Sequence, residues 1–254
     1  MADEGLDRPV TRTVSSVARA LQIIELLIDH PGEELGVTEI ARHLGVAKST
    51  AHQLIATLQS RGFIDQDHMS SRYRLGLRTM EAGTVAAANI GIGPALIPLL
   101  QELVDQVRET SSIGVLSGDG VVLLQRVEAE SILRVDLKLG TRLPLHNSAV
   151  GRMILATLPK EERLQKLEGL QLSPGDLTAT EAAIAEAAQM GCAIVRDIPV
   201  DGISAISVPI RDQQGPAIAG LVVAGPTFRF EPLDYRETAR RMAKKISDRM
   251  KSLV

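Results

Sequence analysis

Hydrogen-bonding and cationic side chains gather in one short segment of the chain, between Lys48 and Gln59. They are Lys48, Ser49, His52, Gln53 and Gln59. Apolar residues recur through the same segment at the i, i+3, i+4 and i+7 spacing of a helix with one buried face. These are Ala51, Leu54, Ile55 and Leu58. Polar side chains of these types, on the opposite face, can bind phosphate oxygens or the edges of bases.

A second, shorter helical pattern precedes this one, and Gly45 separates the two. Its apolar stripe consists of Ile40, Ala41 and Leu44. Val46 can fill the gap between the helices. The arrangement predicts a helix-turn-helix, in which the N-terminal part of the second helix enters the major groove of DNA. An ordinary αα-corner with a solvated polar face remains the alternative.

The flanking segments favour a winged helix. Before the motif, an apolar stripe predicts a helix over about Ser16–Asp29, with Ser15 or Ser16 as its N-cap. The stripe consists of Val17, Ala20, Leu21, Ile24, Leu27 and Ile28. After the motif, two short alternating segments between Phe63 and Leu75 surround a polar tip and predict a β-hairpin. A hairpin directly after a recognition helix is the wing of a winged helix.

Local charge agrees with this prediction. Between Arg42 and Arg78 there are six Lys or Arg and two Asp, whereas the whole chain has a formal net charge of −3. A cationic stripe on an acidic protein is typical of a surface that neutralises phosphates. We expect Lys48 and Arg72 to contact phosphates. The expected base-contacting residues are Ser49, Thr50, His52 and Gln53, and the full predicted DNA-binding set is Thr38, Lys48, Ser49, Thr50, His52, Gln53, Arg61, Ser71 and Arg72.

Composition limits the remaining possibilities. The 254 residues can form two domains, and 44% hydrophobic and 23% charged residues are ordinary for a globular protein. Aromatic residues make up 2% of the chain, which argues against a binder of single strands that stacks bases. One cysteine, Cys192, fits a reducing cytoplasm. The longest apolar stretches fall short of a membrane span, and we expect a cytoplasmic protein without a membrane partner.

The pattern changes after the hairpin. A helix-compatible, alanine-rich segment over Leu77–Asn89 is followed by a Gly-Pro break. The rest of the chain alternates helical patterns with strand patterns. These are a hairpin of Ile113–Leu116 and Val121–Leu124, a half-buried strand at Ile132–Leu139, and two further strands at Ile203–Ile210 and Ala217–Ala224. A capping box at Thr178–Glu181 is expected to open one of the later helices. These elements predict an α+β domain, with one sheet and helices packed against it.

The sequence resembles the IclR-type bacterial transcription regulators over nearly its whole length. The N-terminal half is similar through Val17–Leu21 and the winged helix. The C-terminal half is similar through Gly140–Arg152, through Met190–Cys192 and through the blocks that follow, which are Gly202-Ile203, Ser207–Asp212 and Gly225-Pro226. These blocks, in this order and spacing, are far more specific than a helix-turn-helix alone.

The resemblance implies an α+β protein with an N-terminal winged helix-turn-helix, a linker helix and a C-terminal GAF-like effector-binding domain. The expected boundaries are a flexible arm over 1–12, the winged helix over 13–76, the linker helix over 77–92 and the effector-binding domain over 93–254. It also implies a homodimer or tetramer that binds double-stranded DNA at an inverted-repeat operator. The predicted function is a ligand-responsive regulator, a repressor, of a catabolic or uptake operon.

In such domains the effector pocket is lined by the long strand, the helix after the Pro-Leu-His block and the last strands. By position these residues are Ile132, Val135, Ala149, Val150, Val195, Ala205, Val222 and Ala224, and Ser204 and Ser207 are candidates for orienting the ligand. Ser148 is a further candidate for orienting the ligand. The later positions are mostly aliphatic, and burying a carboxylate among them costs several kcal/mol by order of magnitude. We therefore expect a small organic effector with an apolar or aromatic body. The alternative is that these residues are ordinary core.

Other chemistry has little support in the sequence. The five histidines are scattered without metal-ligand spacing, and Gly202–Ile206 lacks the final glycine of a nucleophile elbow. We expect no enzymatic activity, no cofactor and no bound metal. A winged-helix protein-interaction module without sequence-specific DNA binding remains the alternative function.

Overall fold

The computed structural model describes residues 13–131, 137–211 and 215–251. The predicted arm over 1–12 and the first part of the predicted strand at Ile132–Leu139 lie outside the described residues. Contacts divide the chain into two compact units, residues 1–85 and 86–254, which are described separately.

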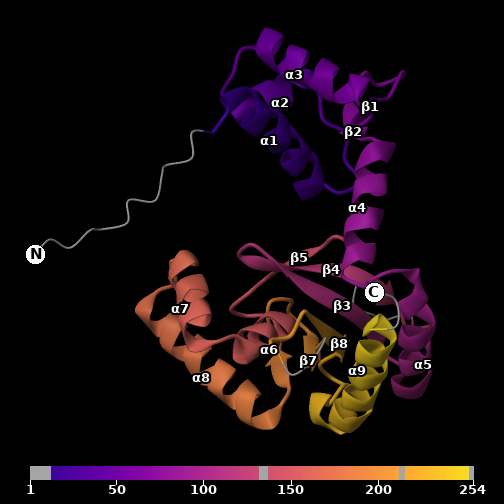
Figure 1. The fold of residues 1–254 in the computed structure, drawn as a ribbon, viewed down its shortest axis with the longest axis vertical. Coiled ribbons are helices and arrows are strands. Elements are labelled where there is room, and N and C mark those ends of the chain that lie inside the picture. The colour runs from indigo at the N-terminus through magenta and orange to yellow at the C-terminus, as the bar shows by residue number, and fades with distance from the viewer. Residues whose placement is uncertain (1–12, 132–136, 212–214, 252–254) are drawn as a thin grey trace, which may run out of the picture. The chain divides into compact units, whose positions relative to one another are not determined.

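Three helices and a two-stranded hairpin make up the N-terminal unit (Figure 1). The elements are α1 (Ser15–Asp29), α2 (Val37–Leu44), α3 (Lys48–Ser60), β1 (Ile64–Gln66) and β2 (Tyr73–Leu75). β1 and β2 are antiparallel, with Asp65 opposite Arg74. The core lies between the three helices and the hairpin, and it contains Ile23, Leu26, Leu27, Leu35, Ile40, Ile55, Leu58, Ile64 and Tyr73. This is the predicted winged helix.

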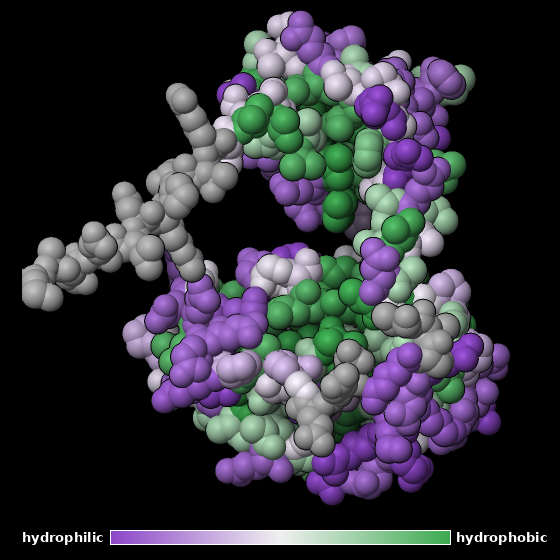
Figure 2. Space-filling model, in the orientation of Figure 1, coloured by the Kyte–Doolittle hydropathy of each residue, from purple (hydrophilic) through white to green (hydrophobic). Residues whose placement is uncertain are grey.

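The buried face of α1 agrees with the predicted stripe only in part: Leu27 is buried, and Ala20 and Ile24 pack against the core. Ile23, Leu26 and Leu27 are buried, whereas Val17 is 56% and Leu21 53% exposed. Two apolar stripes run along this helix, and periodicity cannot tell which one meets the core. The predicted serine cap is also wrong, because Val14 occupies the N-cap position and Ser15 is already helical. Figure 2 shows apolar side chains gathered over α1 on the surface.

Helix α4 (Leu77–Asn89) follows the hairpin, and the division between the units falls inside it. It covers most of the predicted linker and has no buried residue.

One antiparallel sheet forms the centre of the C-terminal unit, with the strand order β5-β4-β3-β8-β7-β6. The strands are β3 (Thr110–Ser117), β4 (Gly120–Val127), β5 (Arg142–Pro144), β6 (Ala193–Arg196), β7 (Ile203–Ile210) and β8 (Ala219–Pro226). The helices are α5 (Ile97–Val107), α6 (Ala149–Thr157), α7 (Lys160–Gly169), α8 (Pro174–Met190) and α9 (Arg236–Lys251), with 3-10 turns at Pro94–Leu96 and Pro232–Tyr235.

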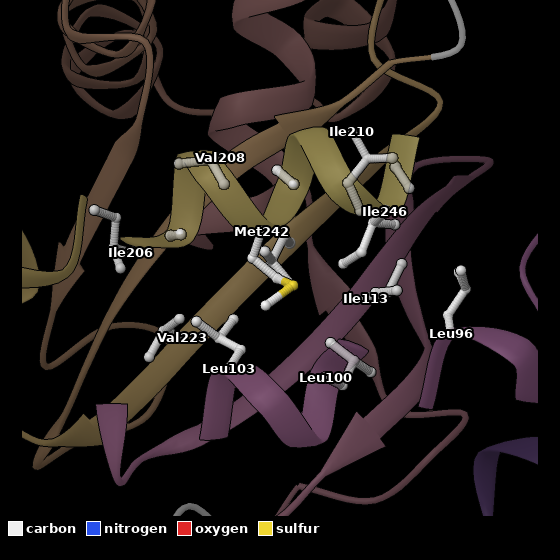
Figure 3. Packing of buried hydrophobic residues seen from close by; sticks show 14 of the residues in the cluster. Leu96, Leu100, Leu103, Ile113, Ile206, Val208, Ile210, Val223, Met242 and Ile246 are labelled. Atoms are coloured by element: carbon white, nitrogen blue, oxygen red, sulfur yellow. The ribbon is translucent and has the colours of Figure 1, made fainter. Parts of the chain in front are cut away.

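Helices cover both faces of this sheet (Figure 1). On one face, Leu100 and Leu103 of α5 and Met242 of α9 point toward the apolar side chains of β7 and β8, as Figure 3 shows. On the other face, α6 packs on β7 and β8, and α8 packs behind α6. The α+β prediction is confirmed, with the sheet between two helical layers.

The start of α8 is a second correction. Ser173 is the N-cap, its Oγ accepts a hydrogen bond from the backbone N–H of Asp176 at 3.2 Å, and Pro174 follows as the first helical residue. Thr178 therefore lies inside the helix, where its hydroxyl donates to the carbonyl oxygen of Pro174. The expected capping box at Thr178–Glu181 is not formed, because a Ser-Pro pair starts the helix one turn earlier.

Candidate DNA-binding surface and effector cavity

The polar face of α3 is exposed to solvent at its N-terminal end. Lys48, Ser49, His52 and Gln53 are all exposed, and Thr50 is half-buried. Within the described part of the chain, the side chains of Lys48, His52 and Gln53 form no hydrogen bond or ion pair. Thr38 and Arg61, on α2 and at the end of α3, are exposed as well. These groups are available to a partner on the surface where a recognition helix presents its first turns.

The helix-turn-helix geometry that presents this face follows from local residues. Gly45 ends α2 in the left-handed conformation, with φ of 64°. The backbone N–H of Val46 then bonds to the carbonyl oxygen of Ala41 at 3.1 Å. Ala51 and Ile55 are buried against the preceding helices and fix the rotation of α3.

The wing tip is held by Asp67. Its Oδ1 accepts hydrogen bonds from the backbone N–H groups of Ser70 at 2.7 Å and Met69 at 3.0 Å. These bonds, the one from Ser70 first, lower the pKa of the Asp67 carboxyl. Ser71 follows with φ of 56° and is exposed at the tip.

Arg72 is engaged within the protein. Its Nη2 lies 2.7 Å from Oε2 of Glu39, and its Nε donates to the carbonyl oxygen of Glu34 at 2.7 Å. Glu39 also accepts a hydrogen bond from the backbone N–H of Gly36. This bond is the largest cause, and the hydrogen bond from Arg72 the second largest, of a lowered pKa at the Glu39 carboxyl. Arg72 thus ties the wing to the start of α2, a structural role that competes with the predicted phosphate contact.

Two further arginines of the predicted cationic stripe are also paired. Arg74 lies 3.2 Å from Glu34, and Arg78 lies 2.6 Å from Glu81. These acids, like Glu39, fall outside the window from Arg42 to Arg78, so the local charge surplus overstated the free positive charge. Among the described residues, the cations of the stripe in no ion pair are Arg42, Lys48 and Arg61.

The recognition helix is joined tightly to the start of α4. The backbone N–H of Gly76 donates to the carbonyl oxygen of Phe63 at 2.8 Å, and that of Arg78 donates to Gly62 at 3.1 Å. The hydroxyl of Thr79 adds a bond to Phe63 at 3.1 Å. A Cβ on Gly76 would overlap the carbonyl oxygen of Gly62. The end of α3 and the first turn of α4 therefore behave as one piece.

A cavity lies in the C-terminal unit, between the sheet and the start of α6. Its empty volume is about 500 Å³, part of it open to solvent. It is lined by Ser112, Leu123, Arg126, Leu137, Leu143, Ser148, Ala149, Val150, Val195, Ile198, Pro199, Val200, Ile203, Ala205, Val222 and Ala224. A mostly apolar hollow with a few polar groups is typical of a small-molecule site.

Many of the predicted effector-binding residues meet at this cavity. They are Ala149, Val150, Val195, Ala205, Val222 and Ala224, with Ser148 beside them. Two predicted residues are not among those that line it: Ser204 is fully buried, with its hydroxyl 3.0 Å from that of Thr227, and Ser207 is fully buried. Alternation along β7 places Ser204 on the opposite face from Ala205. Ile132 and Val135 lie outside the described residues.

Sequence reasoning missed the polar part of the lining, Arg126 and Ser112. These two residues are paired across β4 and β3, and the register shifts between Ile113 and Gly114, where the pairing skips Leu124. The bulge places Arg126 on the same face as Leu123, although simple alternation would put it with Leu124. The sequence does not reveal this change of face, because the pattern of apolar residues in β4 does not show that Leu124 is the unpaired residue of a bulge.

A short loop supplies a further part of the lining. Ile198, Pro199 and Val200 reach the cavity from the loop between β6 and β7. Asp197 fastens this loop, because its Oδ1 accepts from the N–H of Gly202 at 3.0 Å and from the hydroxyl of Thr227 at 2.9 Å. The loop is thus a built wall of the cavity, which the family positions did not predict.

Two further findings concern only the described residues. They hold no group of three or more His, Cys, Asp or Glu side chains arranged for a metal ion. No single helix among them is long and apolar enough to cross a membrane. One bent pair of helices, Leu77–Asn89 with Pro94–Val107, would be so by its combined length and composition only.

Comparison with known proteins gives matches over both units. Residues 16–68 match the family described as the IclR helix-turn-helix domain, and residues 84–248 match the family described as the bacterial transcriptional regulator IclR C-terminal. The chain is 32% identical over 224 residues to the HTH-type transcriptional regulator XynR of Escherichia coli strain K12, covering 86% of this chain and 88% of that protein.

Two more relatives agree. The HTH-type transcriptional regulator KdgR of the same strain is 29% identical over 259 residues, covering 98% of this chain and 97% of the relative. A solved structure of an IclR transcriptional regulator from Alicyclobacillus acidocaldarius has a TM-score of 0.80 at 25% identity, covering 95% of this chain and 99% of that one.

Proposed function

The chain belongs to the IclR family of bacterial transcriptional regulators, and we propose that it is a repressor that binds an inverted-repeat operator as a homodimer or tetramer. The family assigns it a DNA-binding helix-turn-helix and an effector domain, and its members are regulators rather than enzymes. We place the protein in the cytoplasm, where its operator is found, and its target is a catabolic or uptake operon.

The observation that supports operator binding is the open polar face of α3. His52 and Gln53 are exposed in the first turns of the helix. Gln can form paired hydrogen bonds with adenine in the major groove, and Lys48 beside it can neutralise a phosphate. In a dimer, two such helices lie about 34 Å apart, the spacing of successive major grooves.

An apolar stripe on α1 supports a dimer. Val14 at its N-cap and Val17, Leu21 and Ile28 within it are exposed, at spacings of three, four and seven residues. Such spacing is that of a helix that packs lengthwise on another helix. A second copy of the same helix would remove these side chains from water and bring two recognition helices onto one operator.

The cavity supports control by a small organic effector. Its lining is mostly aliphatic and includes Val150, Val195 and Val222. We therefore propose an effector with an apolar or aromatic body. The dimer would have two arrangements, and the effector can change the affinity for DNA only as far as it binds one arrangement more tightly than the other. Helix α4 would transmit the change of arrangement to the winged helices.

A gel shift with the DNA upstream of the protein's own gene and of its neighbours tests the proposal. We expect binding that is stronger than binding to random DNA and that weakens steeply with salt. Equal binding to both DNAs would contradict the operator. Melting curves with a panel of metabolites test the effector: if short hydrophilic acids raise the melting temperature and apolar or aromatic compounds do not, the proposed apolar body is wrong.

A further inference from the structure

A buried cation lies in the wall of the otherwise apolar cavity. The side chain of Arg126 is only 5% exposed. It belongs to one row of residues that crosses four strands: Arg126 on β4 is opposite Ser112 on β3, Ser112 is opposite Val222 on β8, and Val222 is opposite Ser207 on β7. The first three of these residues line the cavity. The cation therefore faces the same space as the aliphatic lining.

Burial of a guanidinium is unfavourable unless anions or hydrogen-bond acceptors replace water. Nη1 of Arg126 lies 3.5 Å from Oγ of Ser112, and Nε lies 3.6 Å from Oε1 of Glu128. Glu128 is 42% exposed, so its carboxylate remains hydrated. A guanidinium carries five N–H donors in a planar fork, and it can therefore bind a ligand carboxylate in addition to its partners in the protein.

A second feature of the cavity also favours negative charge. Ser148, Ala149 and Val150, the N-cap and the first two residues of α6, line it. The N-terminal end of a helix carries partial positive charge from its free N–H groups. The Ser148 hydroxyl is already used, because it donates to Pro144 at 2.6 Å and accepts from Gly151 at 3.1 Å. The polar contacts with a ligand would thus come from Arg126, Ser112 and the helix end.

We propose that Arg126 is the residue that selects the effector, by binding a single carboxylate carried on a compact apolar body. This rests on the proposed function of the cavity as the effector site. A carboxylate buried among the aliphatic residues alone would be poorly solvated, and the guanidinium of Arg126 offsets that cost. The remaining lining is too apolar for a second charge or for several hydroxyl groups, so the ligand is an amphiphilic monocarboxylate.

Matched pairs of compounds test this with the full-length wild-type protein. Benzoate is compared with benzamide, and 4-methylpentanoate with 4-methylpentanamide, by calorimetry and by thermal melting. Each pair keeps its apolar body and differs in charge. We expect each acid to bind at least about 10-fold more tightly than its amide, the range of a charge-assisted hydrogen-bonded pair. Malonate, a small dianion, should bind more weakly than either acid.

Substitutions test whether Arg126 causes the preference for acids over amides. Arg126→Gln should remove the preference for acids and leave the amides within about 3-fold of wild type, while Arg126→Lys should retain part of the preference because it keeps the charge without the fork. Glu128→Gln should bind the acids more tightly, since it removes a competing carboxylate. Arg142→Gln is the control, because Arg142 forms an ion pair with Asp119 outside the cavity.

The outcomes separate the two proposals. If acids and amides bind equally well to the wild type, the proposed role of Arg126 in binding a carboxylate is wrong, whereas the proposed effector site is supported. If no compound of either kind binds, both are wrong. If Arg126→Gln does not fold, the comparison of acid with amide in the wild type and the gain in Glu128→Gln decide; an unchanged or weaker affinity in Glu128→Gln contradicts the proposal.

Discussion

Single side chains of similar type have different roles in the N-terminal unit. Lys48 and Arg61 extend from α3 into solvent, whereas Arg72 is held by Glu39 and by the backbone of Glu34. The difference lies in which acids the fold brings near each cation. Side chains without partners in the protein are the ones that can contact DNA without losing an internal bond.

Gln53 and Lys48 should affect DNA binding in different ways. Gln53→Ala should cost about 1–3 kcal/mol on the operator and little on random DNA, because it removes a base contact. Lys48→Ala should weaken binding on every sequence and lower the salt slope by about one. Fluorescence anisotropy over a salt series measures both effects. Gln59→Ala, from the last turn of the same exposed face, is the control; an equal loss on both DNAs for Gln53→Ala would exclude it from base recognition.

Glu39 should make the stability of the N-terminal unit depend on pH. Its folded-state pKa is lowered by the Gly36 N–H and by Arg72. The unfolded state therefore takes up the proton more readily, and the stabilisation is present above the unfolded pKa of about 4.3 and is lost as pH falls through the folded value. Denaturant unfolding of Glu39→Gln should show a lower stability than wild type near pH 7. The two proteins should converge in acid, and a difference that persists there would argue against this carboxylate.

At the scale of elements, hydrogen bonds fix the junction between α3 and α4 in the N-terminal unit. Three hydrogen bonds join the two helices through Phe63 and Gly62. Beyond this junction α4 buries no residue and contains a glycine, Gly83. A movement of α4 would therefore reach the recognition helix through its first turn.

Two glycines of this region should respond oppositely to alanine. Gly76→Ala should destabilise the unit by about 1–3 kcal/mol, because the new Cβ overlaps the carbonyl oxygen of Gly62. Gly83→Ala should stabilise α4 by about 0.5–1 kcal/mol, because alanine favours a helix and, apart from the helix's own backbone, no atom of the described residues would lie within 4 Å of the added Cβ. Chemical denaturation measures both. If Gly76→Ala were neutral, the junction would be looser than these contacts indicate.

At the scale of the whole molecule, the proposed switch needs a dimer as well as an effector site. Leu21 lies at the centre of the exposed stripe of α1. Leu21→Lys should shift the protein toward monomers in analytical ultracentrifugation. It should lower affinity for a full inverted repeat at least about 10-fold and leave affinity for a half-site unchanged, because a charge at an apolar helix interface is poorly solvated.

Leu164 provides the matched control for this change. It is an exposed leucine on α7, in the C-terminal unit. Leu164→Lys should leave both the sedimentation of the protein and its DNA binding unaltered. A dimer that persists in Leu21→Lys would show that α1 is not the contact between the two copies.

The sequence by itself determined the features that depend on near neighbours. The helical period of α3 fixes Ala51 and Ile55 inside and Gln53 outside, and Gly45 ends α2, because such patterns repeat within one or two turns. The winged helix and the antiparallel pairs follow from these local patterns, and the resemblance to the family follows from the order and spacing of short blocks. Six of the predicted effector-binding residues line one cavity, and they were predicted from the resemblance to the family.

Only the tertiary structure decided which side chains at long range meet. Arg72 is bound to Glu39, 33 residues away, and no local pattern reveals that pair. The two apolar stripes of α1 are alike in period, and only packing buries Ile23 instead of Leu21. Arg126 enters the cavity because a bulge shifts the register between β3 and β4, and one extra residue reverses the face of every side chain beyond it.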